Sequence, residues 1–208
     1  MFLQYLKNTG TRRLILMVIG NIFLGMGVSI FKFSGMGNDP FNGMLMALAN
    51  ITSIAYPVLM ILLNIFLFIL ELVFGRTFIG AGTIVNACFL GYITTFFYTI
   101  IQMLFGEPSE LWQRIIIVCI GVIITSFGVS LYQTADAGIA PYDSLSLITS
   151  KRWPNIPYFW HRMATDAVCA LVCYLAGGII GLGTLLCAFC LGPIVHFFTE
   201  HISKKFLN

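Results

Sequence analysis

Two polar segments interrupt this otherwise apolar chain, and each places a carboxylate close to a proline. The residues there that could do chemistry are Asn38, Asp39 and Asn42 in the first segment, and Tyr142 and Asp143 in the second. Carboxylate, amide and phenol oxygens accept hydrogen bonds from cationic groups, and a carboxylate can also carry a proton. The pattern therefore predicts recognition of a cationic or zwitterionic solute, or coupling to protons.

The same segments carry the signals of one helix that stops and another that starts. Gly37 and Gly138 can adopt the left-handed conformation that ends a helix, and Pro40 and Pro141 suit the first turn of the next helix. Asp39 falls at the N-cap position, where its carboxylate can accept backbone N–H bonds. Two interpretations are open: ordinary capping of an interfacial helix, or a binding element in which two helix N-termini face one cavity.

Further polar residues lie inside apolar segments, where ionisable groups are costly and are functional candidates by default. Asp166 lies midway along the fifth apolar segment with Arg162 four residues earlier on the same helical face, so a local ion pair is an alternative to a binding role. Asn64 and Asn86 are predicted to support the site, although each could simply hydrogen-bond two helices together. Glu71 lies near the end of its segment, where we expect an interfacial position.

A second glycine motif, Gly-x-Gly-Thr, occurs twice and opens an apolar segment each time. Its predicted roles are close helix packing through small residues or, alternatively, a backbone site that a ligand can approach. The positions concerned are Gly82, Thr83, Gly183 and Thr184.

Neither the cysteines nor the motifs predict catalysis. All six cysteines fall in apolar stretches, which argues against a secreted disulfide framework and favours a packing role. The alternative is a soft-metal site that pairs Cys169 and Cys173 with Cys187 and Cys190. The chain lacks a Gly-x-Ser-x-Gly motif, a phosphate-binding loop and a His-rich metal motif. We expect no enzyme activity, no cofactor and no catalytic or metal-binding residues.

The elements that position these residues are repeated along the chain. A shift of 101 residues places Pro40 on Pro141 and brings both glycine motifs into register. We predict a single integral-membrane domain over residues 1–208. Within it, the first repeat covers about 12–104 and the second about 113–205.

Composition predicts a membrane protein. Hydrophobic residues make up 59% of the chain and charged residues 9%, whereas a soluble domain carries roughly 25% charged residues. Six apolar segments approach the roughly 20 residues that cross a bilayer. They lie at about 13–34, 56–75, 82–104, 114–134, 157–177 and 182–199. Two extra short helices are expected at about 41–53 and 142–150.

Basic residues predict the orientation of these segments. With six crossings and both termini in the cytoplasm, nine of the eleven Lys and Arg residues fall on the cytoplasmic side. These nine are Lys7, Arg12, Arg13, Arg76, Lys151, Arg152, Arg162, Lys204 and Lys205. Asn38 and Glu107 then fall outside. Because each repeat crosses an odd number of times, the predicted fold is an all-α, polytopic membrane helix bundle with a 3+3 inverted-topology repeat.

Taken together, the motifs resemble those of the YczE/YyaS/YitT group of bacterial membrane proteins, particularly its YczE-like branch. The residues that carry the resemblance are Gly37 to Phe41, Gly82-Thr83, Gly128-Val129, Gly138 to Ser144, Gly181-x-Gly183-Thr184 and Gly192-Pro193. The resemblance implies a multi-pass protein of the bacterial cytoplasmic membrane. It also suggests a vitamin-like or amine-containing solute.

The sequence thus predicts a small-solute transporter or permease whose binding site lies between two inverted repeats. One alternative is a substrate-capture subunit for a separate energising protein. Another is a membrane scaffold, which would have a packed interior without a solute-sized polar cavity. The expected partners are the lipid bilayer and a small-molecule solute, with a homodimer left open. The net charge of +3 is too small to suggest nucleic acid.

Overall fold

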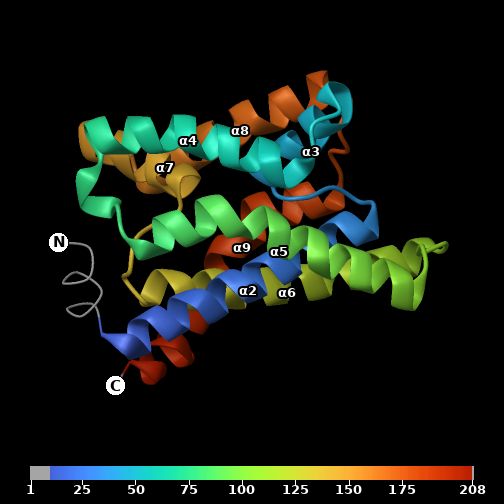
Figure 1. Cartoon of the computed structure of the whole chain (residues 1–208), viewed down its shortest axis with the longest axis horizontal. Helices are drawn as coiled ribbons and strands as arrows, with labels where there is room; N and C mark the ends of the chain where they lie inside the picture. The colour runs from blue at the N-terminus through green and yellow to red at the C-terminus, as the bar shows by residue number, and fades with distance from the viewer. Residues whose placement is uncertain (1–9, 208) are drawn as a thin grey trace.

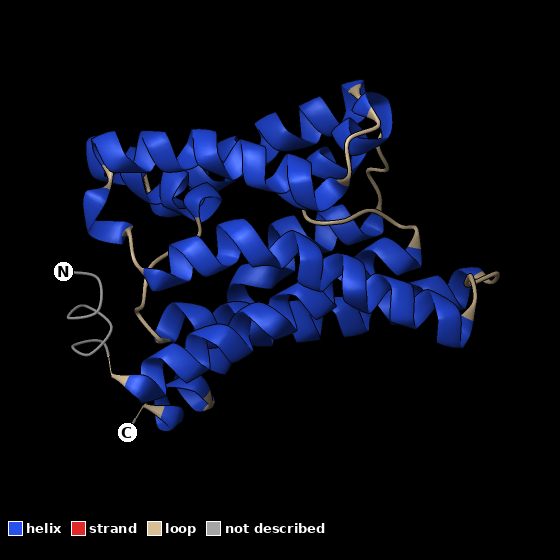
Figure 2. Ribbon diagram, in the orientation of Figure 1, coloured by secondary structure: helices blue, strands red, loops and turns tan. Residues whose placement is uncertain are grey.

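The computed structural model describes residues 10–207, and every regular element within them is helical (Figures 1 and 2). The α-helices are α2 (Thr11–Ser34), α3 (Pro40–Thr52), α4 (Tyr56–Phe74), α5 (Ala81–Phe105), α6 (Leu111–Thr134), α7 (Pro141–Arg152), α8 (Tyr158–Leu175) and α9 (Leu182–His201). Two short 3₁₀ helices, η1 (Arg76–Phe78) and η2 (Ser203–Phe206), complete the set. Lys7, one of the nine basic residues used for orientation, lies outside the described residues.

Five of these helices, α2, α4, α5, α6 and α9, are long and apolar enough to cross a membrane. The helix α8 has 18 residues, but His161, Arg162 and Asp166 make it less apolar than the other five. The prediction of an all-α bundle of membrane-length helices is therefore confirmed, and α8 is the one predicted crossing that composition does not support.

Local sequence signals explain where the short helices begin. The helix α2 ends at Gly35, whose φ of 65° is left-handed. Pro40 then starts α3, and the Asp39 side chain caps it by accepting a hydrogen bond from the Asn42 amide at 3.0 Å. Pro141 starts α7 in the same way. Both short helices thus begin within one residue of their predicted positions.

The first helices of the two halves, α2 and α6, pack closely and run antiparallel. Gly20 of α2 faces Gly128 of α6, while Gly27 faces Thr125, so residue numbers rise along one helix as they fall along the other. A Cβ atom on Gly27 would lie 2.1 Å from the Thr125 hydroxyl oxygen. Glycine is needed there because the backbones approach too closely for any side chain.

Several of the remaining contacts occur in matching pairs, whereas the α4–α5 contact has no α8–α9 counterpart of similar extent. The short helix α3 of the first half packs on α8 of the second, and the short helix α7 of the second half packs on α4 of the first. In the same way, the contact between α2 and α5 is matched by the contact between α6 and α9. Figure 1 shows α3, α4, α7 and α8 on one side of the bundle and α2, α5, α6 and α9 on the other. The largest buried cluster draws side chains from both halves, including Leu24, Phe41, Met60, Tyr132 and Tyr142.

Candidate functional site

The Gly-x-Gly-Thr motifs form a reciprocal seam, in which each packs on the helix break of the other half. The Gly82 amide donates to the Ala137 carbonyl at 2.7 Å, and the Gly183 amide donates to the Met36 carbonyl at 2.9 Å. The two donors are 101 residues apart, and so are the two acceptors. A Cβ atom on either glycine would lie 2.5–2.6 Å from a carbonyl oxygen of the facing break. This geometry favours the packing role over a ligand contact.

The other predicted backbone positions belong to the same seam. Gly37 and Gly138 have φ values of 92° and 112°, which glycine adopts without strain. The Thr83 hydroxyl accepts a hydrogen bond from the Gly80 amide at 3.1 Å and so caps α5. The Thr184 hydroxyl faces Gly37, where a Cβ atom would come within 2.5 Å of it. The seam therefore fixes the breaks, and with them the start of each short helix.

A small polar cavity lies between the two halves, with the first turns of α3 and α7 in its wall. Its volume is about 80 Å³. It is lined by Leu24, Asp39, Phe41, Asn42, Met60, Asn86, Leu90, Thr125, Val129, Ala140, Tyr142, Asp143, Arg162 and Leu191. Pockets for drug-sized ligands span roughly 300–1,000 Å³, so a cavity of this size suits a small ion or a few water molecules.

On the α3 side, the cavity presents a capped carboxylate. The Asn42 amide donates to one Asp39 carboxylate oxygen at 3.0 Å, and the Asn42 side chain donates to the other at 2.9 Å. Tyr56 of α4 fixes Asn42 by donating to its side-chain oxygen at 2.6 Å. Asn38 does not line the cavity, because its side chain donates to the Val28 carbonyl at 3.0 Å and anchors the break to α2.

On the α7 side, Arg162 of α8 joins two carboxylates. Its Nη1 lies 2.5 Å from the Asp143 carboxylate, and its Nε lies 3.3 Å from that of Asp166. The Tyr132 hydroxyl donates to Asp143, and the Tyr142 hydroxyl donates to Asp166. Each acid is thus held by one guanidinium contact and one phenol, which fixes the cluster in place.

The charges around the cavity do not balance. Asp39, Asp143 and Asp166 provide three carboxylates against the single guanidinium of Arg162, and no described Lys or Arg forms an ion pair with Asp39. Burial raises the pKa of the Asp39 carboxyl, and its two hydrogen bonds from Asn42 lower it. When all four groups are ionised, the cluster carries two excess negative charges. Either a proton on Asp39 or a cation in the cavity would reduce this excess.

Two aromatic residues meet at the boundary between the halves. The rings of Phe41 and Tyr142 stack with their centroids 4.3 Å apart and their planes 15° apart. These residues occupy equivalent positions, 101 residues apart. The Arg162 guanidinium also lies 4.9 Å from the centre of the Tyr142 ring. The stack joins the first turns of the two short helices and so sets the width of the cavity between them.

The structure brings five of the eight predicted binding residues to the cavity wall. They are Asp39, Asn42, Asn86, Tyr142 and Asp143. Asp166 lies behind the wall, bonded to Tyr142. Asn64 is buried away from the cavity, and its amide nitrogen has no hydrogen-bond partner among residues 10–207.

Several residues of the site were not predicted as binding residues. Arg162 was expected at most to pair with Asp166, and its contact with Asp143, 19 positions away, had no local signal. Tyr56 and Tyr132 likewise act across long sequence separations. Glu71, expected at the interface, lies near the end of α4, but its side chain is fully buried inside the bundle, at 0% exposure. Its depth results from the packing of α4 against α7, which the sequence of α4 alone does not specify.

The cysteines have a packing role in the described structure. Cys169, Cys173 and Cys187 are buried, and Cys190 is partly buried. Within residues 10–207, no group of three or more His, Cys, Asp or Glu side chains is arranged to hold a metal ion. The soft-metal alternative therefore has no structural support.

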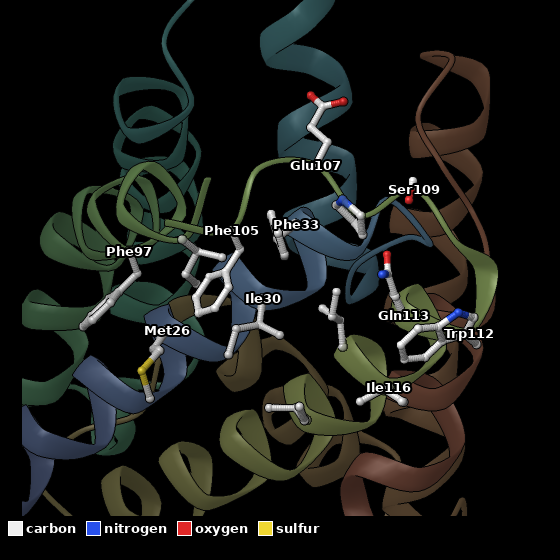
Figure 3. Close-up of a pocket in the computed structure, with 14 residues that line it drawn as sticks. Met26, Ile30, Phe33, Phe97, Phe105, Glu107, Ser109, Trp112, Gln113 and Ile116 are labelled. Carbon is white, nitrogen blue, oxygen red and sulfur yellow. The ribbon is translucent and has the colours of Figure 1, made fainter. Parts of the chain in front are cut away.

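A larger hollow, of about 780 Å³, lies between α2, α5 and α6 near the 106–110 loop (Figure 3). Its wall is mainly apolar, with side chains such as Met26, Ile30 and Phe97. In Figure 3 the Glu107 carboxylate points away from Met26 and Ile30. This hollow lacks the converging polar groups that a polar solute needs, so the smaller cavity is the candidate site.

Comparison with known proteins identifies the family. Residues 11–200 match a family of unknown function, DUF6198. The chain belongs to this family. It is 28% identical over 180 residues to the Bacillus subtilis "Uncharacterized membrane protein YczE", covering 86% of this chain and 81% of that protein. It is 25% identical over 207 residues to the "Uncharacterized protein YyaS" of the same organism, covering 91% and 94%.

A third relative of this DUF6198 member is an uncharacterized protein of Haemophilus influenzae. It is 29% identical over 187 residues, covering 87% of this chain and 80% of the relative. No solved structure matches the chain. The predicted YczE/YyaS-type family is thus confirmed. Together with the five long apolar helices, the match to YczE identifies the chain as a membrane protein with bilayer-embedded helices.

Proposed function

We propose that this protein is a small-solute transporter of the bacterial cytoplasmic membrane, and that its cavity binds a cationic or zwitterionic solute. The observation that carries the proposal is the charge imbalance at the cavity. Asp39 is buried there without an ion pair among the described residues, while Asp143 and Asp166 already share Arg162. Buried charges are normally paired, so an unpaired acid in a membrane bundle is a default candidate for binding a cation or a proton.

The proposed architecture is a 3+3 inverted-topology repeat with six crossings and both termini in the cytoplasm. Three observations support it: α2 and α6 run antiparallel, the seam is reciprocal, and several inter-helix contacts occur in matching pairs. Leu14 and Leu207 pack in one cluster, so the described chain begins and ends at the same end of the bundle. Transporters with inverted repeats bind their solutes at the repeat interface, where this cavity lies.

The position of the cavity supports a transport role further. The side chains of Asp143 and Arg162 are 18% and 33% exposed, so part of the charged wall has free space beside it. The first turns of both short helices border the cavity. Movement of α3 or α7 would therefore change access to Asp39.

A membrane scaffold is a second candidate, favoured by the small volume of the cavity. At about 80 Å³, the space is well below that of an ordinary ligand pocket, and the glycine seam packs the interior tightly. A scaffold would bind no solute. A transporter in a closed state would bind a small cation here, or would open to admit a larger one.

Uptake into proteoliposomes tests the proposal. Purified protein would be supplied with labelled methylammonium, larger primary amines and zwitterionic amino acids. We expect saturable uptake of at least one of these, abolished in Asp39→Asn and strongly reduced in Asp143→Asn. Glu110→Gln is the matched control, because it removes an exposed carboxylate far from the cavity wall. Unchanged uptake in both Asp variants would disprove this site, and no uptake of any probe by well-folded protein would favour the scaffold.

A further inference from the structure

Glu71 is a second acid inside the bundle that has no ion pair among the described residues, and it lies apart from the cavity. It lies in the last turns of α4, its side chain is 0% exposed, and neither carboxylate oxygen has a hydrogen-bond partner among the described residues. An ionised carboxylate without water, partner or counter-ion is strongly disfavoured, and such a group is neutralised instead. The burial of Glu71 therefore indicates a bound proton.

No charged group on the neighbouring elements offers Glu71 an ion pair within the described chain. The helices α3 and α5 contain no Asp, Glu, Lys or Arg, and the other titratable groups of α5 are Cys88, Tyr92 and Tyr98. On α7, Asp143 is bonded to Arg162, Lys151 lies 3.3 Å from Thr77, and Arg152 is exposed. Arg76 of η1 donates to the Leu72 carbonyl at 2.7 Å. A proton is thus the available neutralising group.

The nearest polar side chain of α7 can accommodate a protonated Glu71. Ser144 lies beside Glu71 and is itself fully buried. Its hydroxyl donates to the Pro141 carbonyl at 2.8 Å, which leaves the Ser144 oxygen as an acceptor. A carboxylic acid can donate to that oxygen, whereas a carboxylate cannot.

The position of Glu71 connects the polar interior with one end of the bundle. Met60, Asn64 and Glu71 lie on one buried face of α4, and Met60 borders the cavity. Asn64 is two turns from Glu71, a rise of about 10 Å, and its amide nitrogen has no partner in the described chain. In the other direction, α4 ends only three residues later at the exposed Phe74. A proton at Glu71 is thus about one helical turn from the surface.

The equivalent place in the other half has no acid. Counted from the start of each helix, Cys173 of α8 matches Glu71 of α4, and Gly43 of α3 matches Ser144 of α7 at an offset of 101. A Cβ atom on Gly43 would lie 3.6 Å from the Cys173 sulfur. Both halves therefore have a packing contact at this place, but only the α4–α7 contact includes a carboxylic acid and a hydroxyl.

We propose that Glu71 is a proton-binding site of this protein, loaded in the present closed arrangement and emptied when α4 parts from α7. On release, the O–H bond breaks, the electron pair stays on the carboxylate, and the proton passes to water at the end where the described chain begins and ends. The new carboxylate needs water, so release requires the α4–α7 contact to open. The coupling of this proton to a solute rests on the proposed transport function, but the proton site itself does not.

Infrared difference spectroscopy tests the proton site without any transport assay. Purified protein in lipid, taken from neutral to alkaline pH, should lose the C=O band of a protonated carboxyl and gain carboxylate bands. We expect Glu71→Gln to lack this band, while Asp39→Asn and Glu110→Gln retain it. Persistence of the full band in Glu71→Gln, or its absence from wild-type protein at neutral pH, would overturn the proposal.

A second variant keeps the test valid if Glu71→Gln folds poorly. Ser144→Ala preserves the acid and removes its acceptor, so the band should shift in frequency without being lost. An unshifted band would contradict the Glu71–Ser144 contact. Uptake driven by an imposed pH gradient then separates the two hypotheses. If a pH gradient stimulates uptake by the wild-type protein but not by Glu71→Gln, the coupling is supported. If no uptake occurs while the infrared band of protonated Glu71 is present, only the transport function is overturned.

Discussion

The helices α4 and α8 occupy equivalent places in the two halves but differ in the chemistry of their buried faces. Counted from the first residue of each helix, the matched pairs are Met60 with Arg162, Asn64 with Asp166, Leu67 with Cys169, and Glu71 with Cys173. On α8 the charged groups lie in or next to the cavity wall. On α4 the cavity-level positions are neutral, and the single acid lies near the end of the helix. The backbone is duplicated, and the charged groups are not.

This contrast indicates what each half contributes. The reciprocal seam and the paired contacts give two similar frames. Within them, α8 contributes the ion pairs that hold Asp143 at the cavity, while α4 contributes a neutral wall and a buried acid away from the cavity. The proposed solute site and the proposed proton site therefore lie on different helices.

The largest expected effect comes from making α8 resemble α4. We expect Arg162→Met to lower the free energy of unfolding by about 3 kcal/mol, because it leaves Asp143 and Asp166 without their cation. Adding Asp143→Asn and Asp166→Asn copies the residues of the first half and should recover most of this loss. Denaturant titration in mixed micelles measures both. The assigned ion pairs would be contradicted if Arg162→Met were as stable as the wild-type protein. They would also be contradicted if the triple variant were no more stable than Arg162→Met alone.

The seam glycines test whether the two frames are equivalent. We expect Gly82→Ala and Gly183→Ala each to lower the free energy of unfolding by about 1–3 kcal/mol, because the new Cβ atom meets a backbone carbonyl. Gly192→Ala, which meets nothing within 4 Å, is the matched control and should be near neutral. The same denaturant titration applies, and the two seam variants should agree. Strong destabilisation by only one of them would show that the halves are not packed alike.

The unpaired acid predicts a pH dependence of cation binding. A cation and a proton compete for the Asp39 carboxylate, so the affinity for methylammonium should fall as pH falls through the raised pKa of this group. The fall approaches tenfold per pH unit below that pKa, since each unit is worth about 1.4 kcal/mol. Isothermal titration at several pH values measures this slope. Asp39→Asn should bind methylammonium weakly and with an affinity that does not change with pH. If this variant kept the pH dependence of the wild-type protein, the competing proton would bind at another group.

The aromatic stack should have the smallest effect. Replacement of Phe41 by Leu removes the contact with the Tyr142 ring and should lower the free energy of unfolding by about 1 kcal/mol. Phe66→Leu is the control, because Phe66 is 58% exposed on the outer face of α4. Thermal unfolding in detergent distinguishes the two. Equal melting temperatures for both variants would mean that the stack does not hold the short helices together.

The parts of the fold that depend on local signals were predicted well. Apolar length, glycine and proline set the helix limits within a few residues, and the Asp39 cap follows from its place before Pro40. The parts that depend on packing were not. The contact between Arg162 and Asp143 joins two helices, and the burial of Glu71 depends on α7. Asn38, expected to bind the solute, is 3% exposed because its amide turns back to the Val28 carbonyl.

The central claim is that α8 crosses the bilayer despite its charges, which makes the second half an inverted copy of the first. Cysteines at Asn155 and Ile179, which flank α8 and are both exposed, test this directly. They would be introduced singly into a cysteine-free background and treated with a membrane-impermeant thiol reagent on intact cells. The account predicts labelling at Ile179→Cys on intact cells, and at Asn155→Cys only after permeabilisation. Labelling of both positions from the same side would contradict it, because α8 would then not span the membrane.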